Sequence, residues 1–332
     1  MAVYQFATAG GVERVLLNRA ITLSQSDFEI SLDVHFIRNY GGLKPMYEAI
    51  DRYKIHNYLR VVDSPRLSDY DYIDIIDSPE IFEFVPAAVK LFVECHTSRF
   101  LGQEYLRSMP KTVKAVAVPS ESTALQVRRL TDVPVRIVPN RVPTPGVMTL
   151  QALPWPVMFY VGRIEMGKNT EEAVQIFASA LQSVPDLRMI IISPSVDRSL
   201  IKETAEKLGV RDRILHVGAL SFVGMNSWLQ RLAAGRSVFV SSSRHETWGL
   251  AAAEALSFGI PVVLANNSGH SEVVKGSSSL LYALGNVQDG AGKVASCLLN
   301  PLQIKPTVEK LRDFHVSGDD TIQGLRSIFE LM

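Results

Sequence analysis

The stretch VFVSSSRHETWGLAAAEALSFGIPVVLA, residues 238–265, contains in order an apolar run, a polar loop, an Ala-rich run and a second apolar run. We expect strands at 238–241 and 261–265, because short apolar runs bounded by turn residues are typical of buried strands. The segment 250–258 favours a helix, Gly259 suits its end, and the proline that follows prevents its continuation. A strand, a helix and a second strand predict one unit of a parallel sheet with a crossover helix.

The same alternation of short apolar runs and helical patterns continues along the whole chain. We expect further strands at 3–7, 30–37, 72–76, 89–94, 113–118, 135–138, 157–161, 188–192 and 214–217. Between the two groups lies PNRVPTPGVMTLQALPWP, residues 139–156, whose five prolines and lack of periodicity predict a linker.

These patterns predict an α/β protein with two doubly wound, Rossmann-like domains that face each other across a cleft. The expected divisions are an amino-terminal domain at 1–142, a linker at 143–154 and a carboxyl-terminal domain at 155–332. The last helix of the chain is a candidate to pack back on the first domain. Ligands of such sheets bind beyond the carboxyl ends of the strands.

Charge and cysteine content narrow the class of protein. Lys plus Arg and Asp plus Glu both number 34, so no net charge attracts nucleic acid. Cys95 and Cys297 have neither metal-ligand spacing nor a disulfide framework, which is typical of a reducing compartment. The amino terminus lacks the pattern of a secretion signal, and no apolar run is long enough for a membrane span. We therefore expect a cytoplasmic protein that does not bind nucleic acid.

Two carboxylates in the opening stretch, Glu246 and Glu254, lie eight positions apart. Along a helix this separation corresponds to about 12 Å, whereas the two carboxyl groups of a glycosidase lie about 5 to 9.5 Å apart. The spacing therefore does not suit a pair of hydrolytic carboxylates. It is better suited to two contacts with one extended ligand. Thr247 is the expected helix cap, and the helix amino terminus beside Gly249 is a ready site for an anion.

HETWGLAAAEALSFGIPVV, residues 245–263, resembles the E-x7-E segment of retaining glycosyltransferases of the GT-B fold, particularly the large family 4 (glycosyltransferase group 1). Four further blocks of the family pattern stand in order. They are GGVERVLL (10–17), YVGRIEMGKN (160–169), ILHVGAL (214–220) and SGHSEVV (268–274). The resemblance is strong from about residue 157 to 274 and weaker before it.

The resemblance implies a role for each carboxylate. Glu254 would accept hydrogen bonds from the ribose hydroxyls of the donor, since a carboxylate suits a diol, and Glu246 would contact the hexose. The backbone amides beside the sugar and phosphates would be those of Thr247, Trp248, Gly249 and Leu250. Trp248 stands where Phe is frequent in the family, and its larger ring can alter sugar selection.

The resemblance also implies how the donor phosphates are held. Arg163 and Lys168 match the pair that binds the pyrophosphate, where fixed cations stabilise the charge of the leaving group, so no metal is expected. Gly10 and Gly11 form a turn that allows close backbone approach to the phosphate or the acceptor. His96, at the end of a predicted strand, matches a histidine near the donor sugar. His245 and His270 match no residue that the family needs.

The implied reaction is transfer of a hexose from a UDP- or GDP-sugar to an acceptor hydroxyl, with retention and without a cofactor. The family's proposed mechanism lets the leaving phosphate take the acceptor proton. A nucleotide-sugar epimerase, a phosphorylase and a non-catalytic nucleotide-sugar-binding subunit remain alternatives. An epimerase would convert the donor without an acceptor, whereas a binding subunit would never turn it over.

The acceptor is expected to be a saccharide or a lipid-linked sugar, as in the synthesis of glycans, surface polysaccharides or glycolipids. One basic and apolar stretch could bring the chain to the inner face of a membrane as a peripheral protein. It consists of Arg99, Phe100, Leu101, Tyr105, Leu106, Arg107 and Lys111. A plain amphipathic surface helix is the alternative interpretation of this stretch.

Overall fold

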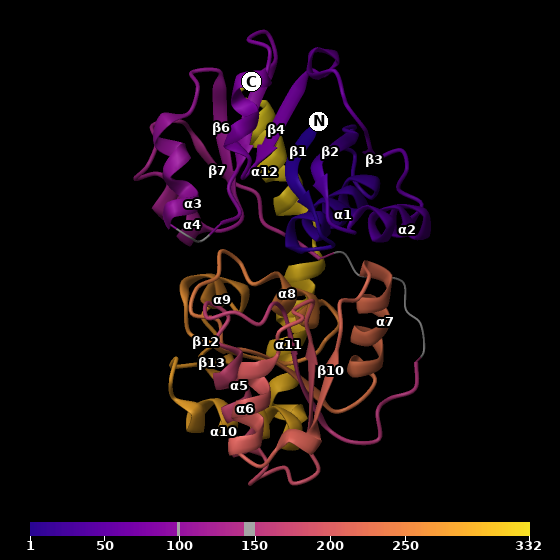
Figure 1. Ribbon diagram of the computed structural model, residues 1–332, viewed down its shortest axis with the longest axis vertical. Coiled ribbons are helices and arrows are strands. Elements are labelled where there is room, and N and C mark those ends of the chain that lie inside the picture. The colour runs from indigo at the N-terminus through magenta and orange to yellow at the C-terminus, as the bar shows by residue number, and fades with distance from the viewer. Residues whose placement is uncertain (98–99, 143–149) are drawn as a thin grey trace. The chain divides into compact units, whose positions relative to one another are not determined.

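The computed structural model describes residues 1–97, 100–142 and 150–332, which form two units, each built on a parallel sheet (Figure 1). One unit comprises Met1–Pro143 and Ser317–Met332, and the other comprises Thr144–Val316. Two doubly wound parallel sheets confirm the predicted α/β fold class. Residues 317–332 belong to the first unit; the sequence prediction counted them in the second domain and named the last helix as a candidate to pack back on the first. The part of the predicted linker at 143–149 lies outside the described residues.

The first sheet has seven strands in the order β3-β2-β1-β4-β5-β6-β7. Their bounds are β1 Ala2–Ala7, β2 Leu32–Asn39, β3 Leu59–Val61, β4 Tyr72–Ile76, β5 Lys90–Glu94, β6 Val113–Val118 and β7 Val135–Ile137. Six of these strands overlap the predicted ones. The edge strand β3 was missed because three residues are too short to show a period.

Helices cover both faces of the first sheet. They are α1 Gly11–Ser24, α2 Leu43–Tyr53, α3 Phe100–Gln103, α4 Glu121–Val127 and α12 Asp319–Phe329. Side chains of β5 alternate, so that Leu91 and Val93 pack toward α4 while Phe92 packs against α12. The guanidinium of Arg141 donates two hydrogen bonds to Asp320, which fixes the start of α12 in this unit.

The second sheet has six strands in the order β10-β9-β8-β11-β12-β13. Their bounds are β8 Val157–Val161, β9 Arg188–Ile192, β10 Ile214–Val217, β11 Ser237–Ser241, β12 Val262–Ala265 and β13 Leu281–Tyr282. The first five match the predicted strands closely. The edge strand β13 was not predicted, because two residues carry no recognisable pattern.

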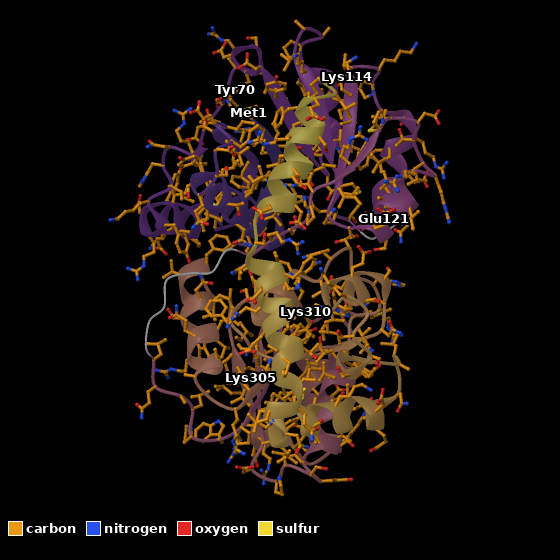
Figure 2. All side chains as sticks on the ribbon, turned by 180° about the vertical axis from the view of Figure 1, so that it is seen from behind. Met1, Tyr70, Lys114, Glu121, Lys305 and Lys310 are labelled. Atoms are coloured by element: carbon orange, nitrogen blue, oxygen red, sulfur yellow. The ribbon has the colours of Figure 1, made fainter. Side chains whose placement is uncertain are left out.

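The seven helices described in the second unit divide between the two faces of its sheet. They are α5 Thr170–Ala180, α6 Ser199–Lys207, α7 Phe222–Ala233, α8 Leu250–Ser257, α9 Ser268–Val273, α10 Val287–Leu299 and α11 Pro301–Val316. Met158 of β8 packs in a core with α5, α6 and α10, whereas its neighbour Phe159 packs with α7, α8, α9 and α11. Exposed Lys305 and Lys310 mark the outer side of α11 (Figure 2).

Candidate donor-binding site

Two loops leave the carboxyl edge of the second sheet from neighbouring strands, β8 and β11. After β8 the chain crosses to β9 on one side, and after β11 it crosses to β12 on the other. Such a switch point is where open α/β sheets bind ligands, because the two connections diverge and leave a crevice. The first loop carries Arg163 and Lys168, and the second carries Glu246. The fold therefore brings the predicted phosphate and sugar residues of this unit to one edge.

Lys168 and Glu246 form the central contact of this edge. Lys168 Nζ lies 2.6 Å from Glu246 Oε1, with side-chain exposures of 26% and 16%. Burial alone would raise the pKa of Glu246, but Lys168, His270 and a hydrogen bond from Ser243 together hold this pKa below its ordinary value. Glu246 is thus ionised at neutral pH and is paired with the cation that the sequence assigned to the phosphates.

Hydrogen bonds between the two loops hold Lys168 in place. The Arg244 amide donates to the carbonyl oxygen of Gly167 at 2.9 Å, and Ser242 Oγ donates to that of Asn169 at 2.7 Å. The amide of Ile164 donates to Ser195 Oγ at 2.8 Å, so the Ser-Pro-Ser turn after β9 supports the same loop. These bonds fix the backbone on both sides of Lys168.

Arg163 is less restrained than Lys168. Its side chain is 63% exposed and lies 3.2 Å from Glu165 Oε1 in the same loop. A pair between an exposed guanidinium and a half-buried carboxylate contributes little to stability, and Arg163 can turn toward a ligand at small cost. Arg163 therefore lies on the predicted loop, but no described contact joins it to Glu246.

The helix α8 starts differently from the prediction. Its cap is Gly249, with φ +95°, and not Thr247, and no side chain caps it by a hydrogen bond. Leu250 is the first helical residue, so Glu254 is the fifth and lies about one turn inside, whereas a cap at Thr247 would place it about two turns inside. Glu254 is buried, at 5% exposure. The predicted amides of 247–250 lie in the loop and first turn at the mouth of α8.

Trp248 does not present its ring to this site. The side chain is 5% exposed, belongs to the core with α7, α8 and α11, and packs edge to face against His315 at 6.1 Å between ring centroids. The expectation that the larger ring alters sugar selection is therefore wrong for direct contact. Only the backbone of Trp248 remains for the predicted role beside the sugar.

His270 is a site residue that the sequence interpretation ranked too low. It lies in α9 with 1% exposure, and its protonated form would lower the pKa of Glu246. A Cβ on Gly269 would lie 2.4 Å from the carbonyl oxygen of Glu246, so this glycine allows α9 to approach the Glu246 loop. The SGHSEVV block, which contains His270, could have drawn attention to this residue. The sequence alone did not show that α9 begins in contact with the loop that carries Glu246.

Gly249 should be intolerant of a side chain. A Cβ there would lie 3.1 Å from His270 Cδ2, and a φ of +95° already disfavours L-residues. We expect Gly249→Ala to lower the free energy of unfolding by more than Gly259→Ala. Gly259 has a φ of +75°, and a Cβ there would have nothing within 4 Å. Gly259→Ala should therefore lower the free energy of unfolding by about 1 to 2 kcal/mol. Urea denaturation of both variants measures this, and equal losses would contradict the described contact with His270.

The predicted residues of the first unit lie in two places. Gly10 precedes α1 as its cap, and Gly11 is its first residue. The Glu13 carboxylate reaches back to accept hydrogen bonds from the amide and hydroxyl of Thr8, which closes this turn. The turn at Gly10 and Gly11 thus forms the start of α1, and the Glu13 hydrogen bonds to Thr8 stabilise it.

His96 follows β5 and is held by a buried ionic cluster. Its Nε2 lies 2.8 Å from Glu94 Oε2, and Arg19 donates to both oxygens of Glu94, at 2.5 and 3.1 Å. Burial would raise the pKa of Glu94, but Arg19 and His96 lower it below the ordinary value. Burial raises the pKa of nearby Asp74, as does the negative charge of Glu94. Glu94 and Arg19 are supporting residues that the sequence interpretation did not identify.

Replacing Glu94 should destabilise the first unit strongly. Glu94→Gln removes the nearest anion of buried Arg19 and leaves only the Asp74 carboxyl at 4.0 Å, and breaking one partner of a buried pair typically costs about 3 to 5 kcal/mol. The control is Glu121→Gln, because the Glu121–Arg128 pair is 52% and 45% exposed. Such exposed pairs contribute about 0 to 1 kcal/mol. Denaturant unfolding should separate the two variants by several kcal/mol, and similar losses would contradict this account.

The proposed membrane stretch is only partly described. Arg99 and the side chains of Phe100 and Leu101 lie outside the described residues. Leu106 is buried in the core of the first unit, at 1% exposure, and so is not part of an exposed apolar face. Arg107 pairs with Glu104 at 3.2 Å. None of the helices within residues 1–97, 100–142 and 150–332 has the length and apolar character to span a membrane.

Known proteins resemble part of the chain in sequence. Residues 152–314 match the family described as "Glycosyl transferases group 1". Sulfoquinovosyl transferase SQD2 of Arabidopsis thaliana is 29% identical over 147 residues, 43% of this chain and 26% of that protein. The lipopolysaccharide core mannosyltransferase LpsB of Rhizobium meliloti is 32% identical over 122 residues, 35% of this chain and 33% of that protein. The matches thus span about a third or less of these relatives.

Structural similarity extends over the whole chain. The structure of HepE from Anabaena, in complex with UDP and glucose, has a TM-score of 0.74 and 16% identity. The comparison covers 99% of this chain and 97% of HepE. Sucrose-phosphate synthase of Thermosynechococcus elongatus has a TM-score of 0.69 and 14% identity, with coverage of 99% and 98%. Residues 152–314 thus match the glycosyl transferases group 1 family, and the chain as a whole has the GT-B fold.

Proposed function

We propose that this protein transfers a hexose from a UDP- or GDP-sugar to an acceptor hydroxyl, with retention at the anomeric carbon. The observation that carries the proposal is the Lys168–Glu246 pair, 2.6 Å apart at the switch point of the second sheet and beside the mouth of α8. A cation next to a helix amino terminus suits a diphosphate, and a carboxylate beside it suits sugar hydroxyls. HepE in complex with UDP-glucose supports the donor class.

In the proposed reaction the diphosphate is the leaving group. Lys168 and the amide groups at the start of α8 stabilise the charge that develops as the glycosidic bond breaks, and Arg163 adds a mobile cation. Glu246 orients the hexose, and Glu254 binds the ribose. The leaving phosphate accepts the proton of the acceptor hydroxyl. Because these cations supply the positive charge, we propose that the reaction needs no metal.

The direct test is a donor panel. UDP-glucose, UDP-N-acetylglucosamine, GDP-mannose and GDP are added in turn, with and without EDTA, and thermal unfolding and donor hydrolysis are measured. We expect one nucleotide class to raise the melting temperature and its sugar to be released slowly without an acceptor. Release of an altered sugar nucleotide would indicate an epimerase instead. Binding without any turnover, even with saccharide and lipid-linked acceptors, would support a binding subunit.

The acceptor is proposed to be a saccharide or a lipid-linked sugar. LpsB acts in lipopolysaccharide core biosynthesis, and a Xanthomonas relative is named for transfer of mannose to a cellobiosyl-diphosphopolyprenol. Extension of a surface polysaccharide or glycolipid fits both relatives. Incubation of the identified donor with labelled acceptors of each kind tests this proposal, and transfer to neither would contradict it.

A further inference from the structure

A buried histidine is aimed at the amino terminus of α8. His270 is 1% exposed, and its Cδ2–Nε2 edge faces the cap residue Gly249. A Cβ on Gly249 would lie 3.1 Å from Cδ2 and 3.7 Å from Nε2. The imidazole therefore lies at the helix mouth, where the first amides of α8 have no helical partner.

The hydrogen bonds of the ring determine which nitrogen carries the proton. Nδ1 lies 2.8 Å from the carbonyl oxygen of Ala265, which can only accept, so Nδ1 is the protonated nitrogen of the neutral ring. Asn267 Nδ2 is also 2.9 Å from Nδ1, but it donates to the carbonyl oxygen of Ser243. No residue in the described part of the chain forms a hydrogen bond with Nε2. Nε2 is thus an open acceptor in the neutral ring and a donor once it is protonated.

Two charged groups act on His270, Glu246 from the loop after β11 and Lys168 from the loop after β8. The end of β12 presents the Ala265 carbonyl to the ring, and α8 presents Gly249. Burial lowers the pKa of His270, with a further contribution from Lys168, and these outweigh the opposite effect of Glu246. In the protein without a ligand, His270 is therefore neutral at neutral pH.

We propose that His270 takes up a proton from solvent when a donor diphosphate binds at the mouth of α8, and then donates a hydrogen bond from Nε2 to a phosphate oxygen. This inference rests on the proposed donor site and adds a titratable cation to it. The negative phosphates favour the imidazolium, which burial disfavours in their absence. Only one proton moves: an N–H bond forms at Nε2, and a hydronium ion or buffer acid of the solvent loses that proton. Donor affinity consequently falls as the pH rises between the free and the bound pKa of His270.

Isothermal titration with UDP-glucose and GDP-mannose tests this inference. The phosphates of these donors lack the second ionisation of a phosphate monoester, so they do not titrate near neutral pH. Titrations from pH 5.5 to 8.5, in buffers of different ionisation enthalpy, count the protons taken up. We expect uptake that approaches one proton, and an affinity that falls by up to about tenfold per pH unit.

Two substitutions assign the proton to His270. In His270→Asn the side-chain amide can still donate to Ala265 but nothing replaces Nε2, whereas His270→Gln places a non-titrating amide near Nε2. Both should lose the pH dependence, and the Gln variant should bind more tightly than the Asn variant. The control is His245→Asn, because His245 is exposed and adjacent to Glu246, and it should retain the pH dependence.

Donor binding without proton uptake would overturn the inference while leaving the proposed function intact. Persistence of the uptake in His270→Asn would also overturn it. If both variants fail to fold, the NMR shift of the His270 Cε1 proton in the wild-type protein decides. It must move to the imidazolium value when the donor is added at pH 7. If neither donor binds at any pH, the proposed donor site fails, and this inference fails with it.

Discussion

Lys168→Ala should lower the rate of donor hydrolysis, and of transfer to an acceptor, by about 100- to 1000-fold, as loss of one pre-organised group at a developing charge typically does. Lys168 Nζ lies 2.6 Å from Glu246 on a loop held by backbone hydrogen bonds, so its ammonium is already positioned before a ligand binds. The measurement is single-turnover release of the nucleoside diphosphate at saturating donor.

The matched control for this variant is Lys202→Ala, which removes an exposed cation from α6 of the same unit. Lys202→Ala should unfold near the wild-type temperature, whereas Lys168→Ala should unfold at a somewhat lower one, because it leaves the half-buried Glu246 carboxylate without its cation. A Lys168→Ala rate within about threefold of wild type, in a folded protein, would exclude Lys168 from the reaction.

Glu246→Gln should separate recognition of the sugar from recognition of the diphosphate. Without the carboxylate, Lys168 loses its anion and becomes fully available to phosphate, so UDP or GDP should bind as well as before or several-fold more tightly. The sugar loses a charge-assisted hydrogen bond, which typically contributes about 1.5 to 3 kcal/mol, so catalytic efficiency should fall about 10- to 100-fold. Calorimetric affinities for the nucleotide and its sugar, with donor hydrolysis rates, test both parts.

Glu203→Gln on the exposed side of α6 is the control for this neutralisation and should change neither affinity. Weaker binding of the free nucleotide by Glu246→Gln would contradict the account, because it would mean that Glu246 supports the phosphates and does not compete for Lys168. The two substitutions should also be non-additive in a double-mutant cycle, since the side chains are in direct contact.

The central strands of both sheets were predictable because buried parallel strands are continuous apolar runs, such as the segment at 157–161. The edge strands were not, since β3 and β13 are too short to show a period. The start of α8 was also mispredicted. Local propensity favours Thr247 as a cap, but the chain reaches the helix through a left-handed Gly249 packed on His270.

Site residues could be predicted where a local sequence motif marks them. They could not be predicted where their role depends on tertiary contacts. Lys168 and Glu246 lie 78 positions apart, and only the family resemblance placed both on one ligand. The burial of Trp248 depends on His315 of α11, and the importance of His270 depends on how α9 meets Glu246. No pattern within the opening stretch encodes either contact.

The most direct test of the account is a crystal structure of the wild-type protein with its intact nucleotide-sugar and no acceptor. The account predicts that the diphosphate lies at the amino terminus of α8 within hydrogen-bond distance of Lys168 Nζ. It also predicts that Glu246 accepts from hexose hydroxyls and Glu254 from the ribose. A donor whose diphosphate lies away from both Lys168 and the start of α8 would contradict it.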